Sequence, residues 1–362
     1  MNTLKLIVTV ALAIALTGGM TACSEWTEQE ILPVVKPTVE SENPDLYRQY
    51  LENLRNYKKT HHQLLIGWFD NSNKAPGSRA WHLEALPDKT DIAVLLDGDN
   101  LADFERAEMD AIRQNKGTKT LYLIDYEAFR QGVEERNLEI EQINTAGQEA
   151  ADADGTTYVP IPFVDLAVEL PGFMDRQLAL LDKYGFDGLS IHFVGKGLLP
   201  ADEEAAMREL QHVIFGKLSA VIQSHAGKLF LFEGLPQNVY DKSLLPAFDY
   251  IVLRTEKLDN IYSITEAAKR SVSLPGIPSG NIIVCASALS TDKTDLITGT
   301  IVDAAGSAQN AIIEIAHWVK TPDTFTKAGL GIYRINDDYY NAETDYKFTR
   351  EAIEILNPSS KN

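Results

Sequence analysis

Eight short apolar runs that alternate with helical patterns constrain the fold of this chain more than any other feature. The runs are Leu64–Phe69, Asp91–Leu96, Lys119–Asp125, Gly188–Val194, Lys228–Glu233, Asp249–Arg254, Asn281–Ser287 and Gly329–Arg334. The helical patterns are Leu101–Asn115, Met174–Tyr184, Glu203–Ser224, Ile261–Ser271, Ala308–Val319 and Tyr346–Leu356. Repeated strand-then-helix units predict an α/β protein with a single-domain (β/α)8 TIM barrel, and a doubly wound sheet is the alternative.

The fourth run, Gly188–Val194, alternates strictly between apolar and other side chains. Leu189, Ile191 and Phe193 fall on one face because side chains alternate along a strand. This bulky apolar face suits the helix-covered outside of a barrel. We therefore expect Ser190, His192 and Val194 to point inward, toward the strand's C-terminal end, where barrel enzymes have their active sites.

The same stretch resembles the signature strand of family 18 glycoside hydrolases, the chitinases and endo-β-N-acetylglucosaminidases. The family pattern is Asp-Gly-x-Asp-x-Asp-x-Glu, and Asp187-Gly188 matches its start. The three later acidic positions hold Ser190, His192 and Val194. Segments Leu65–Asp70 and Leu86–Ala93 are similar to the family's first strand and to the approach to its second. The resemblance covers residues 64–358 and supports the barrel.

Loss of the acidic residues bears directly on activity. In the family, the final Glu protonates the glycosidic oxygen, the substrate's acetamido oxygen attacks the anomeric carbon, and an inner Asp orients that group. Val194 has no proton to donate, and His192 lies one inward step too early to replace the Glu. We expect a pseudoenzyme that binds GlcNAc-containing glycans, either N-glycans or chitin-like chains, without the family's hydrolysis.

Two other functions stay open. Glu233 ends an apolar run, so it is a candidate relocated acid, as are Asp125 and Glu127; the protein would then be an active hydrolase of the endo-β-N-acetylglucosaminidase type. Alternatively, the barrel serves as a non-enzymatic interaction scaffold. No Cys/His spacing suggests a zinc site, His61-His62 is an isolated pair, and we expect neither a metal nor a cofactor.

Polar and aromatic residues at the strand ends are the candidate glycan contacts. Aromatic rings stack on pyranose C–H faces, while carboxylates and amides bind hydroxyl groups. Strand ends are commonly polar and aromatics commonly fill barrels, so a structural role competes at each position, and His192 can be a satisfied interior imidazole. The candidates are Trp68, Asp70, Asp97, Asp125, Glu127, His192, Glu233, Arg254, Tyr333 and Asn336.

The N-terminus predicts export. Residues 1–22 read as a signal peptide with Lys5 before the apolar run Leu6–Leu16, and the next residues resemble a bacterial lipobox ending at Cys23. Ser24-Glu25 resembles a tag for the cell's outer face. We expect a lipoprotein anchored through Cys23 in the outer membrane, at the cell surface. Family context implies outer-membrane glycan importer components as partners.

Composition and the remaining segments complete the predicted organisation. A net charge of −19, from 33 basic and 52 acidic residues, disfavours nucleic acid as a partner and is compatible with neutral sugars. Residues 23–58 read as a proline-containing tether and a lead-in helix from Tyr47 to Lys58, ahead of a barrel at 59–362. If Cys23 is acylated, Cys285 is a buried thiol.

Two long connections follow barrel strands. Glu127–Pro171 is largely polar, and Thr291–Ser307 contains a candidate small hairpin at residues 297–301. Loops after barrel strands border the functional face, so both segments are candidate walls of a cleft. The part at Ala150–Gly155 is equally compatible with a disordered insert.

Overall fold

The structure is a computed structural model that describes residues 39–197, 199–277 and 280–358. The predicted signal peptide and Cys23 lie outside these residues. The chain divides into two parts between Gln49 and Tyr50, and the second part contains the barrel. In the described residues, no helix has both the length and the apolar character that a membrane span requires.

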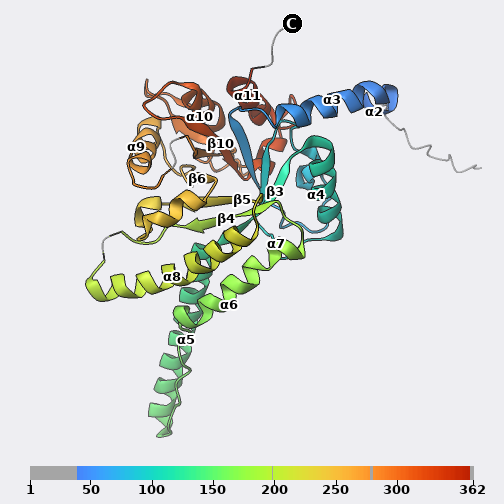
Figure 1. The fold of residues 1–362 in the computed structure, drawn as a ribbon. Coiled ribbons are helices and arrows are strands. Elements are labelled where there is room, and N and C mark those ends of the chain that lie inside the picture. The colour runs from blue at the N-terminus through green and yellow to red at the C-terminus, as the bar shows by residue number, and fades with distance from the viewer. Residues whose placement is uncertain (1–38, 198, 278–279, 359–362) are drawn as a thin grey trace, which may run out of the picture. The chain divides into compact units, whose positions relative to one another are not determined.

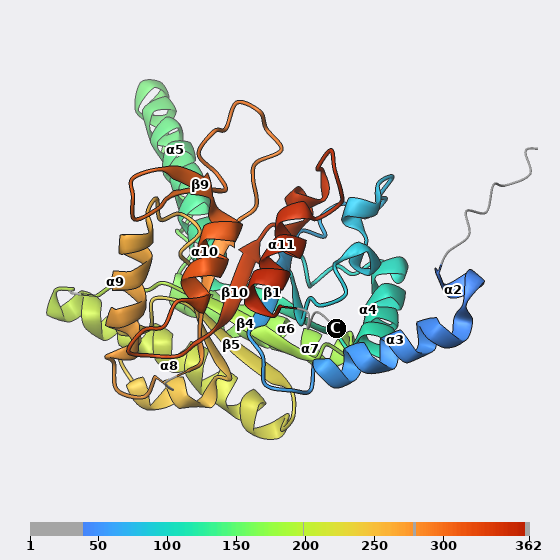
Figure 2. The same ribbon diagram turned by 90° about the horizontal axis from the view of Figure 1, so that it is seen from above.

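Eight parallel strands close into one barrel in the order β1-β10-β7-β6-β5-β4-β3-β2 (Figures 1 and 2). Closure excludes the doubly wound alternative, because β1 pairs with β2 on one side and with β10 on the other. The predicted (β/α)8 barrel is confirmed. The strands are β1 (Leu64–Phe69), β2 (Ile92–Leu95), β3 (Lys119–Asp125), β4 (Gly188–Phe193), β5 (Leu229–Gly234), β6 (Tyr250–Leu253), β7 (Ile282–Ser287) and β10 (Lys327–Tyr333).

Helices follow or connect most of these strands and cover the outside of the barrel. The α-helices are α2 (Val39–Glu42), α3 (Pro44–Tyr57), α4 (Asp103–Lys116), α5 (Tyr126–Asp154), α6 (Leu166–Leu178), α7 (Leu180–Lys183), α8 (Ala201–Ser224), α9 (Ile261–Val272), α10 (Ala311–Lys320) and α11 (Lys347–Leu356). Short 3-10 helices lie at η1 (Arg79–Trp81), η2 (Leu83–Ala85), η3 (Pro236–Asn238), η4 (Lys242–Ala247) and η5 (Ile335–Tyr339).

The apolar core has two layers, one inside the barrel and one between strands and helices. Leu189, Ile191 and Phe193 of β4 belong to the outer layer, as predicted from their alternation. The inner layer contains Trp68 and Cys285, so the predicted buried thiol is confirmed. Because successive side chains alternate, this division places Ser190 and His192 on the inner face of β4.

The segment predicted as a polar connection or insert, Glu127–Pro171, is mostly helical, which corrects that prediction. The 29-residue helix α5 begins after Asp125, whose Oδ1 accepts from the Ala128 amide at 3.0 Å, and ends at Gly155 with φ +64°. Its Ala, Glu and Gln residues favour helix, and pairs one turn apart support it, as when Gln148 donates to Asp152 at 2.7 Å. A weak apolar period made this helix hard to recognise.

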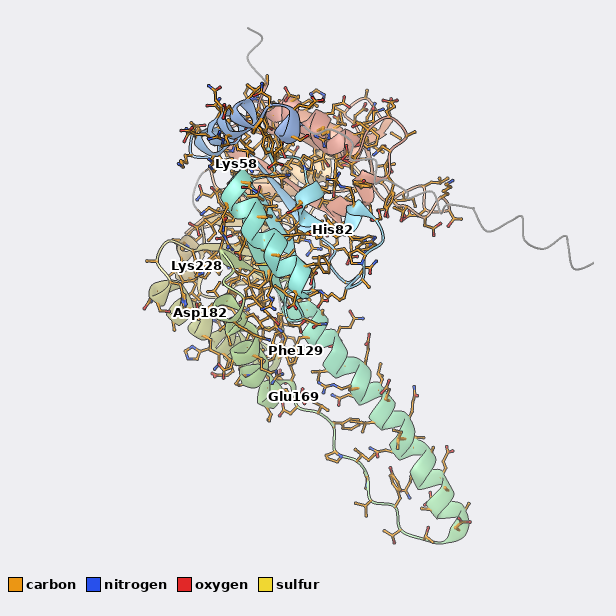
Figure 3. The ribbon with its side chains drawn as sticks, turned by 90° about the vertical axis from the view of Figure 1, so that its right-hand side faces the viewer. Lys58, His82, Phe129, Glu169, Asp182 and Lys228 are labelled. Carbon is orange, nitrogen blue, oxygen red and sulfur yellow. The ribbon has the colours of Figure 1, made fainter. Side chains whose placement is uncertain are left out.

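Helix α5 and the segment after it form an arm that projects away from the strands (Figures 1 and 3). The return segment, residues 156–164, runs back along α5. Asn144 clamps it, accepting from the Ile161 amide at 2.8 Å and donating to the Ile161 carbonyl at 2.9 Å. Asn137, two turns earlier, makes the same pair of bonds to Val164 at 2.7 and 2.9 Å. The arm is therefore an ordered element.

The predicted helix Ala308–Val319 begins three residues later than expected. Residues Ala308–Asn310 form strand β9, which pairs antiparallel with β8 (Thr300–Val302). Helix α10 then starts at Ala311, because the Asn310 side chain caps it by accepting from the Ile313 amide at 3.2 Å. A hairpin thus exists in this connection, but it extends beyond the predicted residues 297–301.

Candidate functional site

The C-terminal ends of the eight parallel strands form one rim of the barrel, and the predicted site residues gather there. The strand register aligns Asp125 of β3 with His192 of β4, and His192 with Glu233 of β5. Arg254 follows β6, and Tyr333 ends β10. Residues far apart in the sequence therefore meet at one end of the barrel, as the barrel prediction implies.

Glu233 lies in the barrel interior beneath this rim, with 0% of its surface exposed. Its Oε1 accepts from the Trp68 indole N–H at 2.7 Å and from the Ser190 hydroxyl, and its Oε2 lies 3.3 Å from the Arg254 guanidinium. Burial raises the pKa of this carboxyl, while the charge of Arg254 and the two hydrogen bonds act against the rise. Both carboxylate oxygens are occupied by protein groups, so Glu233 is inaccessible as an acid.

Ser190 supports the carboxylate of Glu233 from the neighbouring strand. Its hydroxyl, at a position where the sequence resemblance leads one to expect an Asp, donates to Glu233 Oε1. One buried carboxylate, supplied by β5, is thus held by β1, β4 and β6 together. The sequence offered no signal for this hydrogen bond, because Ser190 and Glu233 are 43 residues apart.

Arg254 forms the next layer toward the opening. Its guanidinium also pairs with Glu256 at 2.8 Å and lies 4.3 Å from the centroid of the Tyr333 ring. The second oxygen of Glu256 is buried and has no hydrogen-bond partner among the described residues. This layer combines a charge-balanced guanidinium with an aromatic ring, and both side chains keep exposed surface that can contact a sugar.

His192 and Asp125 form a dyad at the opening. The His192 Nδ1 lies 2.9 Å from Asp125 Oδ1, which orients the imidazole. Burial acts to raise the pKa of Asp125, but the hydrogen bond and charge of His192 together lower it. No described residue bonds the His192 Nε2, and the side chain keeps 14% exposure. His192 is therefore held by a carboxylate rather than by Tyr or backbone groups, and it has one nitrogen left for a ligand.

The residues around Val194 are held by Glu127. The backbone amides of Val194 and Gly195 donate to Glu127 Oε1 at 2.8 and 3.1 Å, and Arg130 binds Oε2 at 3.1 Å. Asn238 donates to the Val194 carbonyl at 2.9 Å from the opposite side. These contacts fix the end of β4 and engage the Glu127 carboxylate. Sequence reasoning missed Arg130 and Asn238, which no motif marks.

The remaining candidates lie beside β1 and β2. Asn336 is buried, accepting from the Asp70 amide at 2.8 Å and donating to the Ala80 carbonyl at 2.8 Å, so it joins loops. The Asp70 carboxylate pairs with Arg334 at 3.2 Å, and Asp97 pairs with Lys74 at 3.0 Å.

Burial divides the ten predicted contacts into two groups. Trp68, Glu233 and Asn336 are buried and act as internal supports. The other predicted contacts keep exposed surface at the rim: Asp70, Asp97, Asp125, Glu127, His192, Arg254 and Tyr333.

Comparisons with known proteins agree with this architecture. The chain matches the model of glycoside hydrolase family 18, BT1044-like, over residues 27–355. A structure of a BT1044 glutamate-to-glutamine variant is similar, with a TM-score of 0.60, 17% identity and coverage of 92% of this chain and 100% of that chain. A search of curated proteins finds no match.

Two further solved structures share the fold. One is a double mutant of endo-β-N-acetylglucosaminidase from Cordyceps militaris in complex with fucosyl-N-acetylglucosamine-Asn, with a TM-score of 0.54, 22% identity and coverage of 85% of this chain and 95% of that chain. The other is a chitinase from Bacteroides thetaiotaomicron, with a TM-score of 0.52, 11% identity and coverage of 83% of this chain and 98% of that chain.

Proposed function

Because this chain belongs to glycoside hydrolase family 18, in its BT1044-like group, and has Val194 in the acid position, we propose that it binds GlcNAc-containing glycans without hydrolysing them. The observation that carries the proposal is that each of the three candidate replacement carboxylates, Glu233, Glu127 and Asp125, is engaged by other groups of the protein. Glu233 has no exposed surface, Glu127 is bonded to two backbone amides and Arg130, and Asp125 is bonded to His192.

Binding is supported by what remains at the rim. The His192 Nε2 lacks a partner among the described residues and its side chain keeps exposed surface, while Tyr333 supplies a ring face beside Arg254. These groups provide a hydrogen-bonding atom and an apolar face, which are elements of a sugar subsite.

Titration of the purified protein against a glycan panel tests the proposal. The panel contains chitooligosaccharides and high-mannose and complex N-glycans, and the products of each incubation are analysed. We expect saturable binding and no released product. His192→Ala should weaken binding about tenfold through loss of one hydrogen bond, whereas His212→Ala, an exposed histidine on α8, should leave it unchanged.

Two outcomes would replace the proposal. Hydrolysis that is abolished by Glu233→Gln and unaffected by His192→Ala would assign a relocated acid to β5, although the burial of Glu233 argues against this. Neither binding nor turnover across the panel would favour the interaction scaffold.

We also propose that the protein is a lipoprotein of the outer membrane, facing outward, and that it works beside glycan importer components. The support is the lipobox-like sequence ending at Cys23 and the acidic residues after it. A palmitate analogue should label the wild type and not Cys23→Ala, and protease added to intact cells should digest the protein. Equal labelling of both forms would refute the proposed lipid anchor at Cys23.

A further inference from the structure

A cavity of about 1070 Å³ lies at the end of the barrel opposite the rim. Leu64, Tyr250 and Lys327, the first residues of β1, β6 and β10, line it, as does Asn281 just before β7. This end of a TIM barrel normally contributes to stability rather than to chemistry. A cavity large enough for an oligosaccharide therefore needs its own explanation here.

The lining of this cavity, called the base cavity from here on, is basic, whereas the chain as a whole is acidic. None of the described lining residues is Asp or Glu, although the whole protein has a net charge of −19. The basic residues in the lining are Lys58, Lys89, Lys320, Lys327, His61 and His62. Carboxylates behind the wall are already engaged, since Asp91 pairs with His62 at 2.9 Å and Glu354 pairs with Lys89 at 3.1 Å. The lining therefore carries more positive than negative charge, although Asp91 and Asp88 act on Lys58 from behind the wall.

Two of these lysines are shielded from water without an ion pair. Lys327 is 4% exposed, and its ammonium group donates to the carbonyls of Trp318 and Thr321 at 2.8 and 2.7 Å. Lys58 donates to the Thr90 carbonyl at 2.5 Å and to the Thr118 hydroxyl at 2.8 Å.

Each of these two ammonium groups therefore uses two of its three N–H donors. Within the described ranges, neither lysine has a carboxylate at ion-pair distance. Burial of an unpaired charge is costly, and it lowers the pKa of Lys58 to about 8. Lys320, at the end of α10, adds an exposed charge to the same wall. An anion in the cavity would supply the missing counter-charge.

The neutral part of the lining indicates what carries that anion. Three tyrosine rings offer apolar faces, and amide and hydroxyl side chains offer hydrogen bonds. The Gln63 Oε1 atom is buried without a hydrogen-bond partner among the described residues. We propose that the base cavity binds an anionic oligosaccharide whose carboxylate or sulfate groups contact Lys58, Lys320 and Lys327. The three tyrosines are Tyr50, Tyr57 and Tyr250, and the amide side chains include those of Asn53 and Asn281.

Isothermal titration of the full-length chain, purified in detergent, tests this site. The probes are a sulfated heparin-derived tetrasaccharide, digalacturonate, inorganic sulfate and neutral diacetylchitobiose. Binding of at least one anionic oligosaccharide should saturate, weaken as NaCl rises, and take up protons near pH 8 because a bound anion favours charged Lys58. Lys58→Gln and Lys320→Gln should each raise the Kd at least fivefold.

Lys228→Gln is the matched control. Lys228 also donates its ammonium group to a backbone carbonyl, that of Phe186, but it does not line the base cavity, and Figure 3 shows it well separated from Lys58. The affinity of this variant for the anionic oligosaccharides should stay within twofold of that of the wild type. If Lys58→Gln fails to fold, exposed Lys320 still provides the test.

Three results would overturn the proposal. They are no saturable binding of either anionic oligosaccharide, equal weakening by Lys228→Gln, or inorganic sulfate binding as tightly as the oligosaccharides. Loss of neutral glycan binding at the rim would affect only the proposed function, because the two sites lie at opposite ends of the barrel.

Discussion

Replacing Glu233 by Gln separates a structural role from a catalytic one. The amide keeps an oxygen that can accept from Trp68 and Ser190, but it puts an uncharged NH2 group where the carboxylate faces Arg254 at 3.3 Å. Breaking a buried ion pair costs about 3–5 kcal/mol. Arg254 retains Glu256 at 2.8 Å, so we expect the lower end, a loss of about 3 kcal/mol in the free energy of unfolding.

Urea unfolding followed by circular dichroism measures this loss, and a double-mutant cycle isolates the pair. Glu233→Gln combined with Arg254→Met should cost less than the sum of the two single changes, because the guanidinium left without its partner is then absent. Ser190→Ala is the milder comparison, with an expected cost of about 1 kcal/mol for one lost donor. Glycan affinity should not change in Glu233→Gln, since no part of Glu233 is exposed.

The reasoning would be refuted by the reverse pattern. Wild-type stability in Glu233→Gln, together with a tenfold or greater fall in glycan affinity or turnover, would mean that the carboxylate acts on the ligand. Additive costs in the cycle would mean that Glu233 and Arg254 do not stabilise each other.

Three further predictions concern the framework. Hydrogen bonding to Asp91 raises the pKa of His62 above its ordinary value despite burial. The pair should therefore stabilise the fold fully below about pH 6.5 and lose this contribution as the pH rises through the raised pKa. The stability of His62→Gln, measured by unfolding across this pH range, should lack this change. Gly188→Ala should lower the free energy of unfolding by at least about 3 kcal/mol or abolish soluble expression, because the new Cβ would lie 1.9 Å from a β5 carbonyl oxygen. Gly77→Ala is the control: its Cβ would enter open space, so it should be neutral in the same expression and unfolding assays. Asn144→Ala should speed limited proteolysis of the return segment at least tenfold, since both bonds to that backbone are lost, and unchanged digestion would mean that other contacts hold the arm.

The sequence by itself was sufficient for the architecture, and the proposed loss of the family's acid rests on it alone. Eight apolar runs at strand length, separated by helical patterns, leave few alternatives to a parallel barrel, and all eight runs match the observed strands to within two residues at each end. Alternation in β4 was equally decisive, because a period of two assigns Ser190 and His192 to one face without any knowledge of neighbours. Val194 in the acid position is read directly from the chain.

Local sequence was a weaker guide where stability depends on distributed contacts. Helix α5 lacks a pronounced apolar stripe, because much of it projects from the barrel and has no core to face. Its order depends on its end caps, on side-chain pairs one turn apart and on two asparagines that clamp the return segment. None of these contacts produces a period that a sequence reading can detect.

Only the tertiary structure decided what the polar residues do. Glu233 looked like a candidate acid until Trp68, Ser190 and Arg254 were found around it, and these partners lie 165, 43 and 21 residues away in the chain. Lys58 is separated from Lys320 and Lys327 of the base cavity by more than two hundred residues, so their shared excess of positive charge exists only after the barrel closes. Burial and charge pairing depend on distances in space, and those distances are set by the closure of β1 onto β10 rather than by any local pattern.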